Sequence, residues 1–514
     1  MNGAESLVHS LLRNDVDLCF TNPGTSEMHF VAALDTIPGM RSVLALHEGT
    51  ATGAADGYWR LARRPACTLL HLGPGLANGL SNLHNARKAG SGVVNIVGEH
   101  ATSHLELDAP LASDIEGIAR PVSHWVETSG HPAMVGSDAA RAVQAARTEP
   151  GQIATLILPG DTAWPAGGQV AGKLEPPAPV VAEEHLVDQA ANLLRSEDSL
   201  LLLGGEALTE RNLRRAGEIA ASTGCALLSE WSNARTERGA GRVWVGRVPY
   251  PIDIAIETLS RFRRIVLLGA RAPIGFFAYP DKPAKLTRPD CEILTLADPA
   301  ADLAGTLETL HSALCSGTKQ TARLAERRFA GIPVGALTPE SIGDVLCHSI
   351  PENAIVVDES ITSGRVFGTA TAGAAPHTWL NNCGGSIGYS LPAAVGAALA
   401  CPDRKILTLT GDGSGMYNPQ AIWTMAREGL DVTMLIFANR SYEILRGELT
   451  NVGVANPGPR AIDMLSLDRP ALDWVALARS MGAEACRVES NVALVRALEA
   501  GFSTKGPVLI EAVL

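Results

Sequence analysis

Residues 407–418 read LTLTGDGSGMYN, and residues 435–445 read LIFANRSYEIL. Each stretch begins with a short apolar run that is typical of a buried β-strand, and small or polar residues follow each run. Asp412 and Asn439 are separated by 439 − 412 = 27 residues, about the length of one strand–helix–strand crossover. The spacing therefore predicts that the two side chains lie side by side at the carboxyl edge of a parallel sheet.

The polar groups after these strands suit a diphosphate that is bound through a magnesium ion. A carboxylate from Asp412, an amide oxygen from Asn439 and a backbone carbonyl are hard oxygen ligands, which Mg²⁺ prefers. Gly411 and Gly413 let backbone N–H groups approach phosphate oxygens, and the next helix offers its N-terminus. A single Gly-Asp-Gly is usually an ordinary turn, but the strand context and the spacing to the asparagine favour a functional site.

The same alternation of short apolar runs and helices continues outward along the chain. It is typical of parallel sheets that are covered on both faces. Two stretches rich in Pro and Gly, 165–181 and 316–337, are interpreted as linkers. The predicted fold class is α/β, with three doubly wound parallel-sheet domains at 1–165, 182–316 and 338–514. Strands are expected at 18–21, 42–46, 67–72, 92–97, 200–203, 226–228, 264–268, 293–296, 355–358, 405–410, 432–438 and 508–512.

Length and composition agree with this organisation. At roughly 150 residues per domain, 514 residues correspond to about three domains. Hydrophobic residues make up 46% and charged residues 19%, a balance that excludes a disordered chain. The formal net charge is 42 − 54 = −12 and no basic stripe is present, so no nucleic-acid partner is expected.

Three further features concern where the protein acts. No stretch approaches about 18 uninterrupted apolar residues, so no membrane span is expected. The N-terminus has no apolar core of a signal peptide. The nine cysteines are scattered without a Cys-x-x-Cys pair, as in a reduced enzyme. The expected location is the cytoplasm.

The GDGSG…NRSY pair resembles the thiamine-diphosphate-binding motif of the acetolactate synthase, benzoylformate decarboxylase and pyruvate decarboxylase family. The resemblance covers essentially the whole chain and implies a pyrimidine-binding, a central and a diphosphate-binding domain, in this order. The other stretches that carry it are NPGTSE (22–27), LHEGTATGAADGY (46–58), LLHLGPGLANGLSNLHNA (69–86), GGSIGYSLPAAVGAAL (384–399) and KGPVLIEAV (505–513).

This resemblance implies thiamine diphosphate and Mg²⁺ as cofactors. Read alone, Glu48 is a helix-capping acid; within the family pattern it matches the glutamate that activates the cofactor by hydrogen bonding to its aminopyrimidine ring. Asp412, Asn439 and the Ser441 carbonyl match the metal ligands. Ile387 matches the apolar wedge that keeps the cofactor bent. The remaining cofactor-binding positions are Gly385, Gly411, Gly413, Ser414, Tyr442, Ser360 and Thr362.

The resemblance also bears on assembly and on a third cofactor. In this family the pyrimidine-binding domain of one subunit faces the diphosphate-binding domain of another, which implies a homodimer or homotetramer with active sites between subunits. A flavin (FAD) is open as a further cofactor but disfavoured. The stretch GARAPIGFF at 269–277 lacks the acidic residues that acetolactate synthases carry there, although Arg271 could partly substitute.

The expected substrate is a small 2-oxo acid. His71 matches the active-site histidine of benzoylformate decarboxylase and could relay protons; the other interpretation is a structural histidine. Thr25 and Ser26 match positions near the substrate carboxylate, and Ile444 matches a substrate-pocket wall. Phe276 or Phe277 occupies the place of a second histidine.

Three functions stay open. The first is decarboxylation followed by acetolactate synthase-like carboligation. The second is simple decarboxylation of a benzoylformate-type 2-oxo acid. The third is a catalytically silent homologue or regulatory subunit, against which the joint presence of Glu48, Asp412 and Asn439 argues. A nicotinamide or flavin dehydrogenase is disfavoured because LGGEAL at 203–208 lacks the Gly-x-Gly-x-x-Gly pattern.

Overall fold

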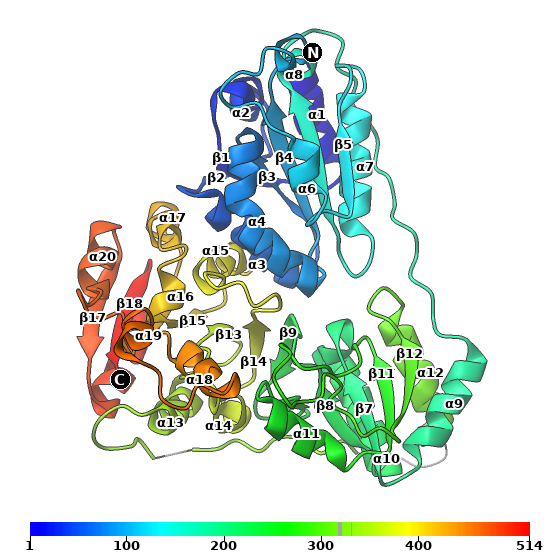
Figure 1. The fold of residues 1–514 in the computed structure, drawn as a ribbon. Coiled ribbons are helices and arrows are strands. Elements are labelled where there is room, and N and C mark those ends of the chain that lie inside the picture. Colours follow the sequence, from blue (N-terminus) through cyan, green and yellow to red (C-terminus); the bar gives the residue numbers. More distant parts are fainter. Residues whose placement is uncertain (317–320, 330) are drawn as a thin grey trace.

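The computed structural model describes residues 1–316, 321–329 and 331–514. Three separate sheets follow one another along the chain, each covered by helices (Figure 1). The predicted fold class is confirmed. The linker predicted at 165–181 runs without helix or strand between α8 and α9, whereas the one predicted at 316–337 includes residues 317–320 and 330, which lie outside the described residues.

The first sheet is parallel throughout and has the strand order β2-β1-β3-β4-β6-β5. Its strands are β1 (Leu18–Asn22), β2 (Arg41–Leu44), β3 (Ala66–Leu70), β4 (Val93–Glu99), β5 (Trp125–Thr128) and β6 (Ile153–Pro159). Its helices are α1 (Gly3–Arg13), the 3₁₀ helix η1 (Thr25–Glu27), α2 (Met28–Thr36), α3 (Glu48–Ala62), α4 (Leu72–Ala89), α5 (Thr102–Leu105), α6 (Ile115–Ala119), α7 (Val135–Arg147) and α8 (Gly160–Ala163).

The second sheet is smaller and has the order β10-β8-β7-β11-β12. Its strands are β7 (Ser199–Leu203), β8 (Ala226–Ser229), β10 (Gly246–Arg247), β11 (Arg264–Leu268) and β12 (Glu292–Ala297). Its helices are α9 (Glu184–Leu194), the 3₁₀ helix η2 (Gly205–Leu208), α10 (Glu210–Thr223), α11 (Ile252–Ser260) and α12 (Leu303–Cys315).

The third sheet has the order β17-β18-β16-β15-β13-β14-β9. Its strands are β9 (Arg235–Arg238), β13 (Ile355–Glu359), β14 (His377–Asn381), β15 (Ile406–Gly411), β16 (Val432–Ala438), β17 (Glu484–Val488) and β18 (Val508–Val513). Its helices are α13 (Pro339–Ser349), α14 (Phe367–Ala370), the 3₁₀ helix η3 (Thr371–Gly373), α15 (Ser390–Ala400), α16 (Asp412–Gly415), α17 (Gln420–Glu428), α18 (Glu443–Asn451), α19 (Pro459–Asp463), α20 (Trp474–Ser480) and α21 (Asn491–Ser503).

Strand β9 departs from the expected division of the chain. It lies within the range 182–316, yet it pairs antiparallel with β14 at the edge of the third sheet. Its sequence, RTER, has no apolar pattern that predicts a strand. Glu237 accepts a hydrogen bond from Thr378 Oγ1 at 2.9 Å, so polar side chains hold this pair together.

The first and third sheets are joined by close packing of α3 against α15. A Cβ atom on Gly57 would lie 2.0 Å from the carbonyl oxygen of Ala393, and one on Gly396 would lie 1.9 Å from that of Ala54. Only glycine permits such an approach of two backbones. This contact brings the loop before α15 close to the first domain. No helix among the described residues is both long and apolar enough to cross a membrane.

Candidate active site

Glu48 begins helix α3, directly after the chain leaves β2. The ring nitrogen Nδ1 of His47 accepts a hydrogen bond from the backbone N–H of Gly49 at 3.0 Å and thereby caps the helix. The Glu48 side chain is buried, and its Oε2 accepts a hydrogen bond from Asn78 Nδ2 on α4 at 3.1 Å. The helix start and one amide thus hold this carboxyl group in a single orientation.

His71 occupies the N-cap position of α4, where β3 ends. The stretch expected to form a strand up to residue 72 and then a loop is instead a strand to Leu70 and a helix from Leu72. His71 Nδ1 lies 2.8 Å from Glu27 Oε2 and 3.4 Å from Ser26 Oγ. The imidazole also packs directly on Gly24, where a Cβ atom would lie 2.1 Å from Nδ1.

Glu27 is a site residue that the sequence reasoning missed. It is 3% exposed, and it accepts hydrogen bonds from the Gly24 N–H at 2.8 Å and from Ser26 Oγ at 2.7 Å besides its contact with His71. A Cβ atom on Gly98 would lie 1.7 Å from Glu27 Oε1, so β4 also closes on the carboxyl group. The signal was present in NPGTSE, where the acid stands three residues after a turn glycine.

Glu48 and His71 both lie close to the backbone of Gly75, which carries no side chain. A Cβ atom on Gly75 would lie 3.1 Å from Glu48 Oε1 and 3.4 Å from the Cβ of His71. Thr25 begins the 3₁₀ turn that carries Ser26 and Glu27. The structure therefore brings four predicted residues and Glu27 to the carboxyl edge of the first sheet, where ligands bind in open α/β sheets.

The second cluster lies at the carboxyl ends of β15 and β16, which are parallel neighbours as the motif spacing predicted. The carboxylate of Asp412 is buried; it accepts hydrogen bonds from the N–H groups of Gly413 at 2.8 Å and Arg440 at 2.7 Å. Asn439 Oδ1 accepts a hydrogen bond from the Ser441 N–H at 3.1 Å. The Asp412 carboxylate thus reaches the residue next to Asn439.

This arrangement fits a magnesium ion. Each oxygen of Asp412 accepts one hydrogen bond and so retains a lone pair for a metal. Burial raises the pKa of the Asp412 carboxyl group above its usual range, and a cation bound there would offset this effect by favouring the ionised form. A site of one carboxylate, one amide and one carbonyl contains a single acidic residue. Among the described residues, no group of three or more His, Cys, Asp or Glu could hold a metal. This finding does not conflict with a magnesium site here, because the site needs only one such residue.

Small residues next to Asp412 let neighbouring groups approach its loop closely. Tyr442 packs on Gly413, where a Cβ atom would lie 2.5 Å from the ring atom Cε1. Ser414 is buried in the short helix α16 that starts at Asp412. Ser360 is turned toward its own strand and donates a hydrogen bond to Asp358 Oδ1 at 2.5 Å. Thr362 is half-buried in the same loop.

The loop 382–390 carries Gly385 and Ile387. Gly385 has a positive φ of 76°, and a Cβ atom there would lie 2.8 Å from Phe276 Cζ, so both the backbone and the neighbouring ring require glycine. Ile387 is half-buried beside it. Ile444 is half-buried on α18, the helix that follows the NRSY stretch.

Glu359 organises this loop and is the second residue that the sequence reasoning missed. Its buried carboxyl group accepts hydrogen bonds from Tyr389 N–H, Ser390 N–H and Asn382 Nδ2 at 3.0, 3.0 and 3.1 Å. Burial raises its pKa to about 7. It lies between Asp358 and Ser360, directly before one of the predicted cofactor-binding residues.

The two clusters belong to different sheets of the chain. No hydrogen bond or ion pair recorded for the described part of the chain joins Glu48, His71 or Glu27 to Asp412, Asn439 or Ser441. The first cluster offers acid–base groups, and the second offers oxygen ligands and bare backbone. A cofactor that needs both sets must meet them from two different sheets.

Comparisons with known proteins agree with this division. Residues 1–118 match the model of the thiamine pyrophosphate enzyme N-terminal TPP binding domain, and residues 365–512 match that of the C-terminal TPP binding domain. The acetolactate synthase large subunit-like protein IlvX of Mycobacterium tuberculosis is 48% identical, over 100% of this chain and 99% of its own. Benzoylformate decarboxylase of Pseudomonas aeruginosa is 29% identical, over 98% of this chain and 96% of its own.

The fold has the same relatives. The solved structure of a thiamine diphosphate-dependent 4-hydroxybenzoylformate decarboxylase from Rhodococcus jostii superimposes with a TM-score of 0.86 at 22% identity and covers 100% of this chain and 99% of its own. This chain thus shares its fold with that structure over its full length.

Proposed function

Since the chain belongs to the thiamine pyrophosphate enzyme family, we propose that it uses thiamine diphosphate and Mg²⁺ to decarboxylate a 2-oxo acid and to join the product to an acceptor, as acetolactate synthases do. The family and a 2-oxo acid as substrate follow from the matches to acetolactate synthase and benzoylformate decarboxylase. Carboligation is the finer part of the proposal. It is supported by the 48% identity to an acetolactate synthase large subunit-like protein.

The observation that carries the catalytic role is the pairing of Glu48 with His71 around Gly75. Thiamine diphosphate, when bound, supplies the nucleophilic carbon and the electron sink. Glu48, held by Asn78 at 3.1 Å, is placed to exchange a proton with the aminopyrimidine ring. His71 is placed to move protons at the substrate, because Glu27 contacts its Nδ1 and leaves Nε2 free for that exchange.

The other residues would hold the cofactor. Asp412, Asn439 and the Ser441 carbonyl would bind Mg²⁺ and, through it, the diphosphate. Gly411, Gly413, Ser414, Tyr442, Ser360 and Thr362 would line the diphosphate, and Gly385 and Ile387 would support the rings. Thr25, Ser26 and Ile444 would face the substrate. As the resemblance to this family implies, we propose that two subunits share each active site in a homodimer or homotetramer, with the acid–base cluster of one subunit facing the metal cluster of the other.

The proposal includes no flavin. The central pocket beside β7 and β11 has a volume of about 320 Å³, near the lower end for a small-molecule site, and aromatic side chains wall it. The backbones of Gly204 and Gly269 are in contact, since a Cβ atom on Gly204 would lie 2.3 Å from the Gly269 oxygen. We further propose a reducing compartment, the cytoplasm, because all nine cysteines are free.

The deciding experiment is a panel of 2-oxo acids with the purified enzyme, thiamine diphosphate and Mg²⁺, with and without aldehyde or 2-oxo acid acceptors. Release of CO₂ together with a chiral 2-hydroxyketone or acetohydroxy acid supports carboligation. Release of CO₂ with free aldehyde, whatever the acceptor, points to the simple decarboxylase instead, which the likeness to benzoylformate decarboxylase keeps as the second candidate. Tight cofactor binding without turnover of any donor identifies a silent homologue.

A further inference from the structure

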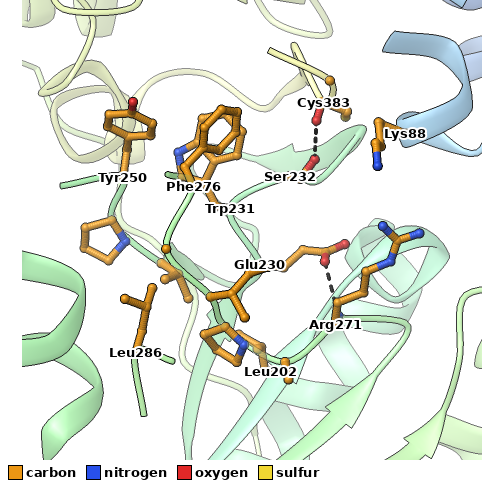
Figure 2. Close-up of a pocket in the computed structure, with 17 residues that line it drawn as sticks. Lys88, Leu202, Glu230, Trp231, Ser232, Tyr250, Arg271, Phe276, Leu286 and Cys383 are labelled. Atoms are coloured by element: carbon orange, nitrogen blue, oxygen red, sulfur yellow. Dashed lines mark hydrogen bonds between the residues drawn. The ribbon is translucent and has the colours of Figure 1, made fainter. Parts of the chain in front are cut away.

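The central pocket beside β7 and β11 lies where the three domains meet, at the carboxyl ends of β7, β8 and β11. Its lining comes mainly from the central domain, with Lys88 from α4 and with Cys383 and Gly384 from the loop before α15 (Figure 2). Of the residues that the sequence analysis assigned to the active site, the lining includes only Phe276, one of the two candidates for the place of a second histidine. In its sheet, β7 lies between β8 and β11, so the pocket opens where the strand order reverses and where such sheets bind ligands.

One half of the pocket carries charges of both signs. Glu230, Arg271, Lys88 and Ser232 lie together on one side of Figure 2. Glu230 Oε2 accepts a hydrogen bond from the backbone N–H of Arg271 at 3.2 Å. Within residues 1–316, 321–329 and 331–514, no ion pair involves Glu230, Arg271 or Lys88. This half therefore offers one carboxylate and two cations to a ligand.

The other half is aromatic and apolar. The rings of Trp231 and Phe276 have their centroids 4.9 Å apart, and Tyr250 lies 5.5 Å from Phe276. The rest of the apolar lining of the pocket consists mainly of Leu202, Leu286 and two prolines. Such a wall favours an apolar or aromatic group of a few carbon atoms and excludes a second charged group at this end.

We propose that this pocket is an effector site that binds a free α-amino acid with an apolar or aromatic side chain. The ammonium group would pair with Glu230, the carboxylate with Arg271 and Lys88, and the side chain would lie against Trp231 and Phe276. A 2-oxo acid of the same shape leaves Glu230 without a cation, and an amine leaves Arg271 and Lys88 without an anion. Only a zwitterion satisfies both signs.

Two residues that line the pocket also contact elements of the candidate active site. A ligand bound in the pocket can therefore influence catalysis. Phe276 packs on Gly385, in the loop that would support the cofactor rings. Tyr250 donates a hydrogen bond to Glu448 Oε1 at 3.3 Å, on the helix α18 that carries Ile444. A ligand that contacts Phe276 and Tyr250 therefore acts on two elements, the loop that would support the cofactor rings and the helix that carries Ile444. This effect on catalysis, unlike the binding itself, rests on the proposed function.

Binding is tested by calorimetry with L-phenylalanine and L-leucine on the purified full chain. Phenylpyruvate and 2-phenylethylamine serve as probes that lack the ammonium or the carboxylate group. We expect a Kd below about 1 mM for an amino acid, and at least about tenfold weaker binding of both probes, because each leaves one charge-assisted contact unmade. Binding of phenylpyruvate as tight as that of L-phenylalanine, or no saturable binding of either amino acid, overturns the proposal.

Variants locate the binding. Glu230→Gln keeps the shape but removes the charge, and Ala272→Trp fills the pocket from its exposed rim. Each should weaken amino acid binding at least about tenfold, whereas the exposed Glu257→Gln on α11 should leave it unchanged. Unweakened binding by Ala272→Trp contradicts the location. With burial raising the pKa of Glu230 to about 7, and with Arg271, Lys88 and the thiol of Cys383 facing it, binding should strengthen from pH 6 to pH 8 as Glu230 ionises.

The effector role is tested with the best 2-oxo acid donor. Saturating L-phenylalanine should change kcat or KM by at least about fivefold in the wild type and in Glu257→Gln, but not in Ala272→Trp. Binding without any change in kinetics overturns the effector role. If binding is intact but no donor turns over, the proposed function fails while the amino acid site stands.

Discussion

The imidazole Nδ1 of His71 lies 2.8 Å from the buried Oε2 of Glu27, a residue 44 positions earlier in the chain. The carboxylate also holds Gly24 N–H and Ser26 Oγ, so it is anchored before it meets the histidine. Because an ionised carboxylate can only accept hydrogen bonds, the Nδ1 atom that faces Glu27 carries a proton, which leaves Nε2 as the ring nitrogen that can exchange one. Glu27 is thus a positioning residue for His71.

Glu27→Gln should lower kcat/KM by about 10²-fold while cofactor affinity stays within a factor of three. Glutamine keeps one accepting oxygen for Gly24 N–H and His71 Nδ1 but loses the negative charge that strengthens both contacts, and misplacement of a catalytic group by about 1 Å costs on this order. Steady-state kinetics with the best donor, and cofactor titration by fluorescence, measure the two quantities. Glu175→Gln, at an exposed position in the linker, is the matched control. A Glu27→Gln enzyme with wild-type kcat/KM contradicts the role.

Glu48→Gln should lower kcat by about 10²–10⁴-fold, the range for loss of a general acid–base group. Glutamine has the same shape and can still accept the hydrogen bond from Asn78, so folding and cofactor binding should be retained. Turnover and cofactor titration on the same preparation separate the two effects. Unchanged turnover would remove Glu48 from the catalytic assignment.

Chelation of divalent ions by EDTA should abolish turnover and release the cofactor, and Mg²⁺ should restore both. Asp412→Asn should weaken cofactor binding by at least about 100-fold, since loss of a group that only supports a metal ligand already costs about 10–100-fold. The exposed Asp403→Asn, near the start of the same strand, should bind normally. Full activity after exhaustive chelation contradicts the metal site.

Replacement of Arg60 should strongly destabilise the fold. Its guanidinium is buried, pairs with Asp56 at 2.7 Å, and donates hydrogen bonds to the carbonyl of Asn381 at 2.6 Å and to Tyr389 Oη at 2.7 Å. Arg60→Met leaves the Asp56 carboxylate buried without its cation, at a cost of about 3–5 kcal/mol in the free energy of unfolding.

The control for this prediction is Arg64→Met. Arg64 pairs with Asp17 at 2.9 Å, but both side chains are 45% exposed, so the loss should not exceed about 1 kcal/mol. Urea unfolding followed by circular dichroism compares the two variants. Equal stability of both would show that the buried network contributes no more than a surface pair.

His377 should make stability fall in mild acid. Burial lowers its pKa to about 3, and its Nδ1 lies 2.7 Å from the Ala375 carbonyl oxygen. The unfolded chain protonates this histidine near pH 6.5, whereas the folded protein does not, so the contribution is fully present above pH 6.5 and is lost as pH falls toward 3. Between pH 7.5 and pH 5.5 the wild type should lose about 1 kcal/mol more than His377→Gln. Parallel pH profiles of the two proteins contradict this.

The local patterns of the chain predicted a large part of the molecule. Apolar runs bounded by Gly and polar residues located the principal parallel strands. A strand that is buried on both faces appears in the sequence as a short, continuous run of apolar residues. The 27-residue spacing from Asp412 to Asn439 predicted their placement on adjacent strands, which β15 and β16 confirm. The helix that begins at Glu48 was also recognisable, because a helix start is itself a local signal.

What the sequence alone could not determine depends on residues that are distant along the chain. Strand β9 is made of polar residues, three of them charged, and becomes a strand only because β14 offers an open edge. Glu27 contacts His71 across 44 residues, and Glu359 holds the backbone of Tyr389 and Ser390 across 30 and 31. The pocket of Glu230, Arg271 and Lys88 draws on three domains. Sequence patterns show which secondary structure a segment favours. Contacts between distant side chains, and a pocket lined by several domains, form only when separate segments pack together, so tertiary structure alone decides them.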